Sequence, residues 1–399
     1  MSDFGDALAR WMQVRHVGVR ELARISRYSA GYIARLRNSF ERPSPECGAE
    51  LDEVLGAGGE LAALATGRRT APDKDALAPA MLPPRLITVT GADDVSPVEH
   101  LRRFRDLISD HDSLFGPRAL IPVVCNHLAL IRQIRHGRAG STARDLLILQ
   151  AQYAETLAWQ YQDCAEFRSA QYWLDRALEW AHMAHDMQWA AFVLARKSQL
   201  AGDMHDPVAA VGLAEAAARL TPGGGARLRA AVAAYEAHGY ALAGNPNACQ
   251  RALEDAAQIA ASPEGDPAAP WAAWLTPAYV EMARARCLDA LGDHEDAVTL
   301  FEHAIGGIPA TLRRERGVHL ARQAVACLGA GDPAGASDAG VRAARIAGIT
   351  QSGRIITELR RLGHAMRRRW PSHSATNEVH RVLASLLVPG HPAPRGGNR

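Results

Sequence analysis

The chain has 399 residues, of which 48% are apolar, 22% charged and 6% aromatic, so it can form two or three domains that each bury a core. Its formal net charge of +2 favours no class of partner, and no run of 18 apolar residues could cross a membrane. The amino-terminal segment lacks the apolar stretch of a secretory signal, so we expect a soluble cytoplasmic protein that does not bind membranes. Alanine and leucine dominate the apolar residues, which predicts an all-α fold.

Residues 1–65 have the pattern of a compact helical domain. Phe4, Leu8 and Trp11 recur at the spacing of one apolar helix face, and a second short apolar pattern follows. Ser29 then provides an N-cap hydroxyl for a further short helix. Two short helices separated by three or four turn residues are typical of a helix-turn-helix, whose second helix enters the major groove of DNA. We therefore expect this domain to bind DNA.

Positive charge is concentrated in the same domain. Eight arginines and two glutamates lie from Arg10 to Arg42, a net charge of +6, as is typical of proteins that bind the phosphate backbone. Tyr32 and Arg35 share one helix face, where Arg35 could bond to a guanine, contact a phosphate or make no contact. The candidate DNA-binding residues are Arg20, Arg24, Arg27, Ser29, Ala30, Tyr32, Arg35, Arg37 and Arg42.

Two segments lack helical periodicity. Residues 66–96 contain four prolines and are expected to form a linker, and residues 388–399 are expected to form a disordered tail. Residues 97–387 are helical in pattern and contain a recurring turn motif with an acidic or amide residue. It occurs at Asp163, Asp203, Asn245, Asp293 and Asp332. A period of about 40 residues predicts an α-solenoid of helical hairpins, with a single all-α bundle as the alternative.

The tetratricopeptide pattern of small residues fits these hairpins. It places Ala170, Leu174 and Ala177 at close-packing positions of the first hairpin and Ala297 at one of the fourth. Small side chains are needed there because two helices approach to about 8–10 Å only where the side chains between them are short. The fifth hairpin matches less well, since Gly340 stands where a bulky residue belongs.

The leading helices of the hairpins present an inner face that mixes aromatic, amide and arginine side chains. Such a surface could hold an extended peptide or an acidic small molecule, whereas ordinary packing between hairpins is the alternative for each residue. The candidate effector-binding residues are Gln152, Glu155, Trp159, Trp189, Phe192, Arg196, Gln199, His238, Tyr279 and Arg286. The fifth hairpin instead offers Val318, Ala321, Val325 and Leu328, which indicate helix packing or a dimer contact.

The chain contains no catalytic signature. It has none of the motifs GxSxG, HExxH and SxxK, and its glycine clusters do not continue into a phosphate-binding loop. The six cysteines stand far apart and are expected to be buried or inert. We expect no enzyme activity, no catalytic residues, no metal site and no cofactor.

The amino-terminal unit resembles the xenobiotic-response-element (XRE, lambda-repressor-like) helix-turn-helix family. The resemblance is carried by VRELARISRYSAGYIARLRNSFERPSPECGAELDEVLGAGGELAALA, which begins at Val19. The later segments AQYWLDRALEWAHMAHD and RKSQLAGD are similar to high-GC bacterial regulators in which that domain precedes tetratricopeptide-like repeats. The resemblance implies a transcriptional regulator that forms a homodimer on double-stranded DNA and whose repeat region senses a peptide or small-molecule effector.

The sequence departs from the family pattern at several positions. Gly18 and Val19 stand where members have Ser or Thr followed by Gln, and Arg27 stands where the turn has glycine. Gly18 has no side chain to cap the helix, and Val19 cannot make the contact that glutamine makes. A second hypothesis follows, namely a protein-interaction scaffold whose helix-turn-helix domain does not bind specific DNA.

Overall fold

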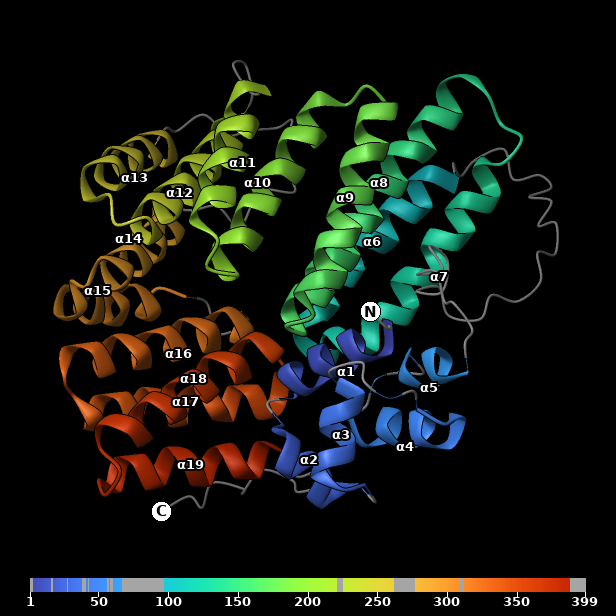
Figure 1. Cartoon of the computed structure of the whole chain (residues 1–399). Coiled ribbons are helices and arrows are strands. Elements are labelled where there is room, and N and C mark those ends of the chain that lie inside the picture. The colour runs from blue at the N-terminus through green and yellow to red at the C-terminus, as the bar shows by residue number, and fades with distance from the viewer. Residues whose placement is uncertain are drawn as a thin grey trace, which may run out of the picture. The chain divides into compact units, whose positions relative to one another are not determined.

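A computed structural model gives the structure of the chain and describes residues 3–15, 17–26, 28–37, 41, 43–55, 57, 60–66, 97–220, 225–261, 277–308 and 312–387. These residues form helices joined by turns and contain no strand, so the all-α prediction is confirmed for them (Figure 1). The chain divides into two compact units, Met1–Leu82 and Pro83–Arg399. Most of the predicted linker and all of the predicted tail lie outside the described residues.

The described residues of the first unit form five short helices around a small apolar core. They are α1 (Asp3–Val14), α2 (Val19–Ile25), α3 (Ala30–Arg37), α4 (Pro45–Leu55) and α5 (Glu60–Ala65). Phe4 and Leu8 of α1 are buried against Ile33 and Leu36 of α3, as the apolar spacing predicts. The buried carboxylate of Asp52 accepts the backbone N–H groups of Leu61 (2.8 Å) and Ala62 (3.3 Å), and so joins α4 to α5.

The starts of α2 and α3 follow from the sequence. Gly18 is the N-cap residue of α2 and makes no side-chain bond there, whereas the Ser29 hydroxyl accepts the N–H of Tyr32 at 3.3 Å and caps α3. Residues 26–29 separate the two helices, and α2 packs on α3. The charged side of α3 is thereby left facing away from the core, because Ile33 and Leu36 are fully buried.

The second unit is a succession of longer helices. They are α6 (Pro97–Phe115), α7 (Pro117–Arg135), α8 (Gly140–Asp163), α9 (Phe167–Met183), α10 (Met187–Asp203), α11 (Pro207–Leu220), α12 (Ala226–Leu242), α13 (Pro246–Ala260), α14 (Pro277–Leu291), α15 (His294–Gly306), α16 (Arg313–Ala330), α17 (Pro333–Thr350), α18 (Gly353–Arg369) and α19 (Ser374–Leu387). Each helix packs on the next along most of the series, and α10, α12, α14 and α16 also pack in sequence on one another (Figure 1).

Small residues allow these helices to approach one another. Ala170, Ala177 and Ala297 are fully buried, as the repeat pattern predicts. Gly340, which fits the pattern poorly, has a packing role of its own, because a Cβ atom there would lie 2.9 Å from Leu362 Cδ2. The six cysteines are buried and form no disulfide.

The last helices of the second unit contact the first ones. Helix α18 packs on α8, and α17 packs on α6. A Cβ atom on Gly353, at the start of α18, would lie 2.4 Å from the backbone carbonyl of Cys164, so only glycine fits at this approach. Side chains more than 180 positions apart in the sequence therefore meet where α8 ends.

The recurring turn residues fall into two groups. Asn245 and Asp332 are N-cap residues whose side chains accept backbone N–H groups of α13 and α17, and Asp293 is the N-cap residue of α15. Asp163 and Asp203 are instead the last residues of α8 and α10. All five positions thus lie at helix ends, where the sequence predicts turns, but the carboxylates of Asp163 and Asp203 bond to partners far away in the sequence.

Candidate functional site

The sequence-predicted DNA-binding residues lie on or beside α2 and α3. Arg20, Arg24, Arg35 and Arg37 are exposed, and Ala30 and Tyr32 are half-buried. The hydroxyl of Ser29 caps α3. Arg27 and Arg42 lie outside the described residues. Two short helices thus place four exposed guanidinium groups on one small unit.

Two of these arginines have acidic partners. Arg24 Nη2 lies 2.5 Å from Glu21 Oε1, and Arg35 Nε lies 2.7 Å from Glu41 Oε2. Exposed pairs of this kind contribute about 0–1 kcal/mol, so a phosphate or a base edge can replace the carboxylate at small cost. Arg35 also lies over the ring of Tyr32, with Cζ 5.9 Å from the ring centroid. Burial raises the pKa of Tyr32 to about 12, so its phenol keeps its proton and can donate a hydrogen bond.

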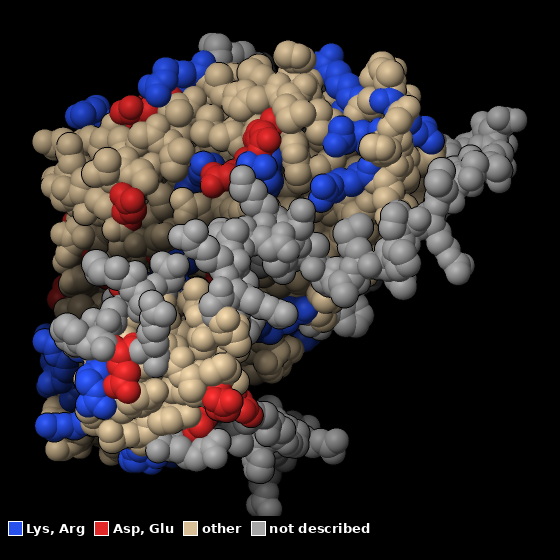
Figure 2. Space-filling model, turned by 45° about the vertical axis from the view of Figure 1, so that its right-hand side comes forward, with Lys and Arg blue, Asp and Glu red and all other residues tan. Residues whose placement is uncertain are grey.

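Surface charges indicate a binding site less clearly than buried charges do. On the face drawn in Figure 2, charged side chains form small groups between wide areas of uncharged residues. Within the described residues of this face, neither sign of charge forms one continuous field. The second unit, by contrast, contains a connected set of buried charges.

We call this set the interior charge network. It consists of the carboxylates of Glu155, Asp163, Asp203 and Glu315 and the guanidinium groups of Arg196, Arg286, Arg314, Arg322 and Arg354. Five cations therefore meet four anions. The residues come from α8, α10, α14, α16 and α18, so the network joins the early and late helices of the unit.

One half of the network surrounds Asp203. Its Oδ1 accepts from Arg286 Nη2 of α14 at 2.7 Å and from Arg322 Nη2 of α16 at 3.2 Å. Its Oδ2 accepts from Gln162 Nε2 of α8 at 2.8 Å. Burial acts to raise the pKa of Asp203, but the arginines and the Gln162 bond outweigh it and hold that pKa well below its usual range. Asp203 is therefore ionised and shared by two arginines.

The other half surrounds Asp163, whose side chain is fully buried. Asp163 Oδ1 accepts from Ser352 Oγ and from Arg354 Nε, each at 2.9 Å, and its Oδ2 lies 3.4 Å from Arg314 Nη1. Arg354 Nη2 also donates to Glu315 Oε1 at 3.2 Å. Two carboxylates and two arginines balance here, and they tie the end of α8 to the start of α18. We call this half the Asp163 clasp.

Arg196 and Trp159 join the two halves. Arg196 donates to Glu155 Oε1 at 2.8 Å and to Gln162 Oε1 at 3.0 Å, and Gln162 in turn donates to Asp203. The centroid of the Trp159 ring lies 4.7 Å from Cζ of Arg196, 4.5 Å from Cζ of Arg354 and 6.0 Å from Cζ of Arg314. These cation–π contacts favour the charged form of arginine where water is largely excluded.

Seven of the sequence-predicted effector residues belong to this region. Glu155, Trp159, Arg196 and Arg286 are described above, and Gln199 Nε2 donates to the Tyr279 hydroxyl at 3.3 Å. His238 is buried against Gly202, where a Cβ atom would lie 2.6 Å from His238 Nδ1. Burial lowers the pKa of His238, and Arg286 and Arg322 lower it further. The spacing of the leading helices therefore identified residues that the fold brings together.

The remaining predicted effector residues lie elsewhere. The rings of Trp189 and Phe192 pack on each other at 4.8 Å within the apolar core, and Arg105 Cζ lies 5.9 Å from the Trp189 ring. Gln152 is half-buried, and its Oε1 accepts no hydrogen bond from the described residues.

Sequence reasoning missed the network residues of α16 and α18. Val318 and Ala321 of α16 are buried and serve helix packing, as expected. The residues that directly follow them, His319 and Arg322, belong to the polar face of the same helix. One face of this otherwise buried helix carries Glu315, His319 and Arg322, at the spacing i, i+4, i+7. This spacing is visible in the sequence and could have identified the polar face of α16.

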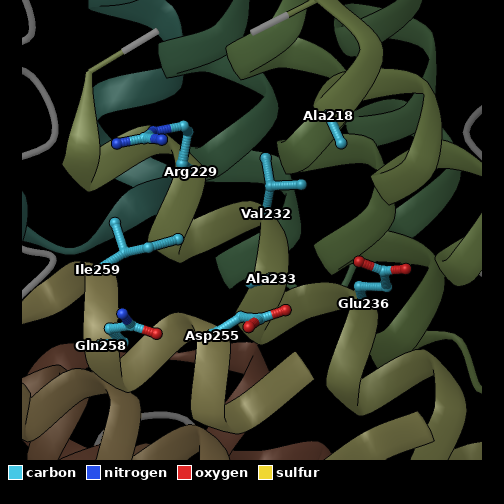
Figure 3. A pocket seen from close by; sticks show the side chains of 8 residues that line it. All are labelled: Ala218, Arg229, Val232, Ala233, Glu236, Asp255, Gln258 and Ile259. Carbon is cyan, nitrogen blue, oxygen red and sulfur yellow. The ribbon is translucent and has the colours of Figure 1, made fainter. Parts of the chain in front are cut away.

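A cavity of about 330 Å³ lies between α11, α12 and α13. Figure 3 shows its lining, which none of the predicted effector residues joins: Ala218, Arg229, Val232, Ala233, Glu236, Asp255, Gln258 and Ile259. Burial raises the pKa of Glu236, and the charges of Glu215 and Asp255 add to that effect. Asp255, Gln258 and Arg229 are exposed, so this cavity opens to solvent.

Comparison with known proteins assigns the chain to no group. No family model matches it, and no curated protein matches it significantly. Among the described helices, none is both long and apolar enough to span a membrane. Function must therefore be argued from the residues themselves.

Proposed function

We propose that this chain is a sequence-specific DNA-binding transcriptional regulator. In this proposal α2 and α3 form an XRE-like helix-turn-helix, and the second unit is a tetratricopeptide-like solenoid that forms a homodimer and senses an effector. The observation that carries the proposal is the exposure of Arg20, Arg24, Arg35 and Arg37 around α3, while Ile33 and Leu36 hold that helix in the core.

The homodimer and the effector role are supported by different observations. A homodimer follows from the family resemblance and would bind two half-sites about one helical turn of DNA apart, or a multiple of it. The effector role is supported by the interior charge network, which joins helices distant in the sequence. An effector changes DNA binding only if it binds one arrangement of the dimer better than another.

The test is selection of genomic DNA fragments by the full-length protein, with sequencing of the bound fraction at two salt concentrations. We expect one enriched sequence motif, with affinity that falls as salt rises because phosphate contacts release counterions. Arg35→Gln should weaken binding to that motif by about tenfold or more, since a bidentate contact to a base provides about 1–3 kcal/mol. Arg219→Gln, an exposed arginine of α11, is the matched control.

The scaffold hypothesis is favoured by the acidic partners of Arg24 and Arg35 and by the lack of a side-chain cap at Gly18. The same selection separates the two functions. Binding that is absent, or equal for all fragments, would contradict the regulator and favour the scaffold.

A further inference from the structure

We propose that Arg286, Arg322 and His319 form a binding site for a small anion with at least two acceptor oxygens, of the phosphate or carboxylate type. The site lies beside Asp203. This inference deepens the effector role in the proposed function and rests on it for its regulatory meaning.

The two arginines beside Asp203 carry more positive charge than that carboxylate compensates. Arg286 and Arg322 both donate to the same oxygen of Asp203, so two guanidinium groups share one carboxylate. Of the nearby carboxylates, Asp163 and Glu315 bond to Arg354, and Asp289 bonds to His294. Glu315 and Asp289 also attract Arg322 and Arg286 through their charge, but Asp203 is the carboxylate to which both guanidinium groups donate. Glu358 acts on Arg322 but lies 3.6 Å from its own partner Arg361. A buried excess charge is costly, and a bound anion would remove that cost.

Arg286 and Arg322 are also the more exposed arginines of the network. The side chains of Arg286 and Arg322 are 19% and 17% exposed, whereas those of Arg196 and Arg354 are 4% and 7% exposed. The two arginines with the shared carboxylate are therefore the ones that a solute can reach. Each carries several N–H donors in a planar fork, which suits the paired oxygens of a phosphate or carboxylate.

His319 adds a buried hydrogen-bonding group beside Arg322. His319 lies three positions before Arg322 on α16 and is 5% exposed, and its Nδ1 has no hydrogen-bond partner within the described part of the chain. Burial, together with Arg322, lowers the pKa of His319 to about 3, so the ring is neutral at pH 7. A neutral imidazole carries one N–H, which can donate to an anion oxygen. Buried polar groups are otherwise nearly always bonded.

The position of the site gives it a means of regulation. Asp203 also accepts from Gln162, which precedes Asp163 of the clasp in the sequence and bonds to Arg196. An anion that bonds to Arg286 and Arg322 weakens the bonds between Asp203 and these arginines of α14 and α16. Binding is thereby coupled to the contacts between early and late helices of the unit.

The test measures binding by calorimetry and thermal shift on the full-length protein without DNA. Inorganic phosphate and succinate are titrated separately at constant ionic strength set with chloride. We expect saturable binding of at least one of the two, and the stronger binder identifies whether the source is a phosphate or a carboxylate compound. Saturable binding of neither anion would overturn the proposal.

Three variants and one control make the test specific. Arg322→Gln should weaken binding at least tenfold, and Arg322→Lys should weaken it less, because the charge is kept while the planar fork is lost. Asp203→Asn should strengthen binding several-fold, because it removes the internal competitor. Arg342→Gln, on the exposed side of α17, should leave affinity unchanged.

The sign of the Asp203→Asn effect separates this site from a purely structural ion network. If the network only stabilises the fold, Asp203→Asn lowers the melting temperature and phosphate or succinate does not restore it, which would overturn the proposal. Failure of the DNA selection leaves this result unaffected, since DNA is absent from the assay.

Discussion

Asp163→Asn tests whether the Asp163 clasp holds the two ends of the second unit together. The substitution keeps the size of the side chain but removes one negative charge from a fully buried position. Arg314 and Arg354 then face Glu315 as the one carboxylate of the clasp, and one guanidinium charge is left uncompensated. Asparagine keeps one oxygen that can accept from Ser352 and Arg354, as Asp163 Oδ1 does, and places an NH2 group near Arg314 where aspartate has Oδ2.

The expected magnitude follows from the cost of a broken buried ion pair, about 3–5 kcal/mol. For a cooperative unit of roughly 300 residues the unfolding entropy is about 0.6 kcal/mol/K, so the melting temperature should fall by about 5–8 °C. Local opening should increase mainly where the clasp holds the helices together. A loss of about 3 kcal/mol corresponds to roughly hundredfold faster amide exchange wherever the clasp limits opening.

Calorimetry and hydrogen exchange together measure both effects. The amide of Ile356, which donates to the Ser352 carbonyl at 3.2 Å in the first turn of α18, should lose protection first. The control is Asp338→Asn, because Asp338 is 73% exposed and pairs with Arg342 at 3.4 Å on the surface of α17. An exposed pair contributes about 0–1 kcal/mol, so the control should change the melting temperature by less than about 2 °C.

Equal melting temperatures for the two variants would refute the reasoning, because burial would then make no difference to the energy of the pair. A fall in melting temperature with unchanged exchange at α18 would show that Asp163 stabilises α8 and does not tie it to α18.

Two further predictions concern the same unit. The pKa of His319 is lowered to about 3, so its stability contribution is present above the unfolded pKa near 6.5 and is lost as pH falls. Between pH 6.5 and 5 the loss is roughly 2 kcal/mol, and denaturant titrations should show a flatter pH dependence for His319→Asn; parallel curves would contradict this. Gly353→Ala should cost about 1–3 kcal/mol, because its Cβ would lie 2.4 Å from the Cys164 carbonyl; an unchanged urea midpoint would contradict that close approach.

The helical content and much of the core could be predicted from local pattern. Phe4 and Leu8 are buried at the expected spacing, and Ala170, Leu174 and Ala177 are buried where the repeat pattern requires small or apolar residues. These predictions succeed because an apolar face depends on neighbours three or four positions away in the same helix. The start of α3 succeeds for the same reason, since the Ser29 hydroxyl accepts the N–H of Tyr32 three positions later.

The partners of the buried charges could not be predicted in this way. Asp163 and Asp332 follow similar turn patterns in the sequence, yet one bonds to Arg354 and the other to the N–H of Gly335. The difference depends on which helix arrives at the turn from far along the chain. Arg286 could be placed on the inner face from the register of α14, but its carboxylate partner lies 83 residues away. Local spacing predicts the face that a side chain occupies, and tertiary structure determines its partner.

The two halves of the interior charge network differ in a way that makes their functions separable. The Asp163 clasp has equal numbers of carboxylates and arginines, and its arginines are less than a tenth exposed. A balanced set whose arginines are buried favours one arrangement of the helices without offering a site to anions. Around Asp203 the arginines outnumber the carboxylate and are partly exposed. Anions should therefore restore stability to Asp203→Asn and have little effect on Asp163→Asn, although both substitutions remove one buried negative charge.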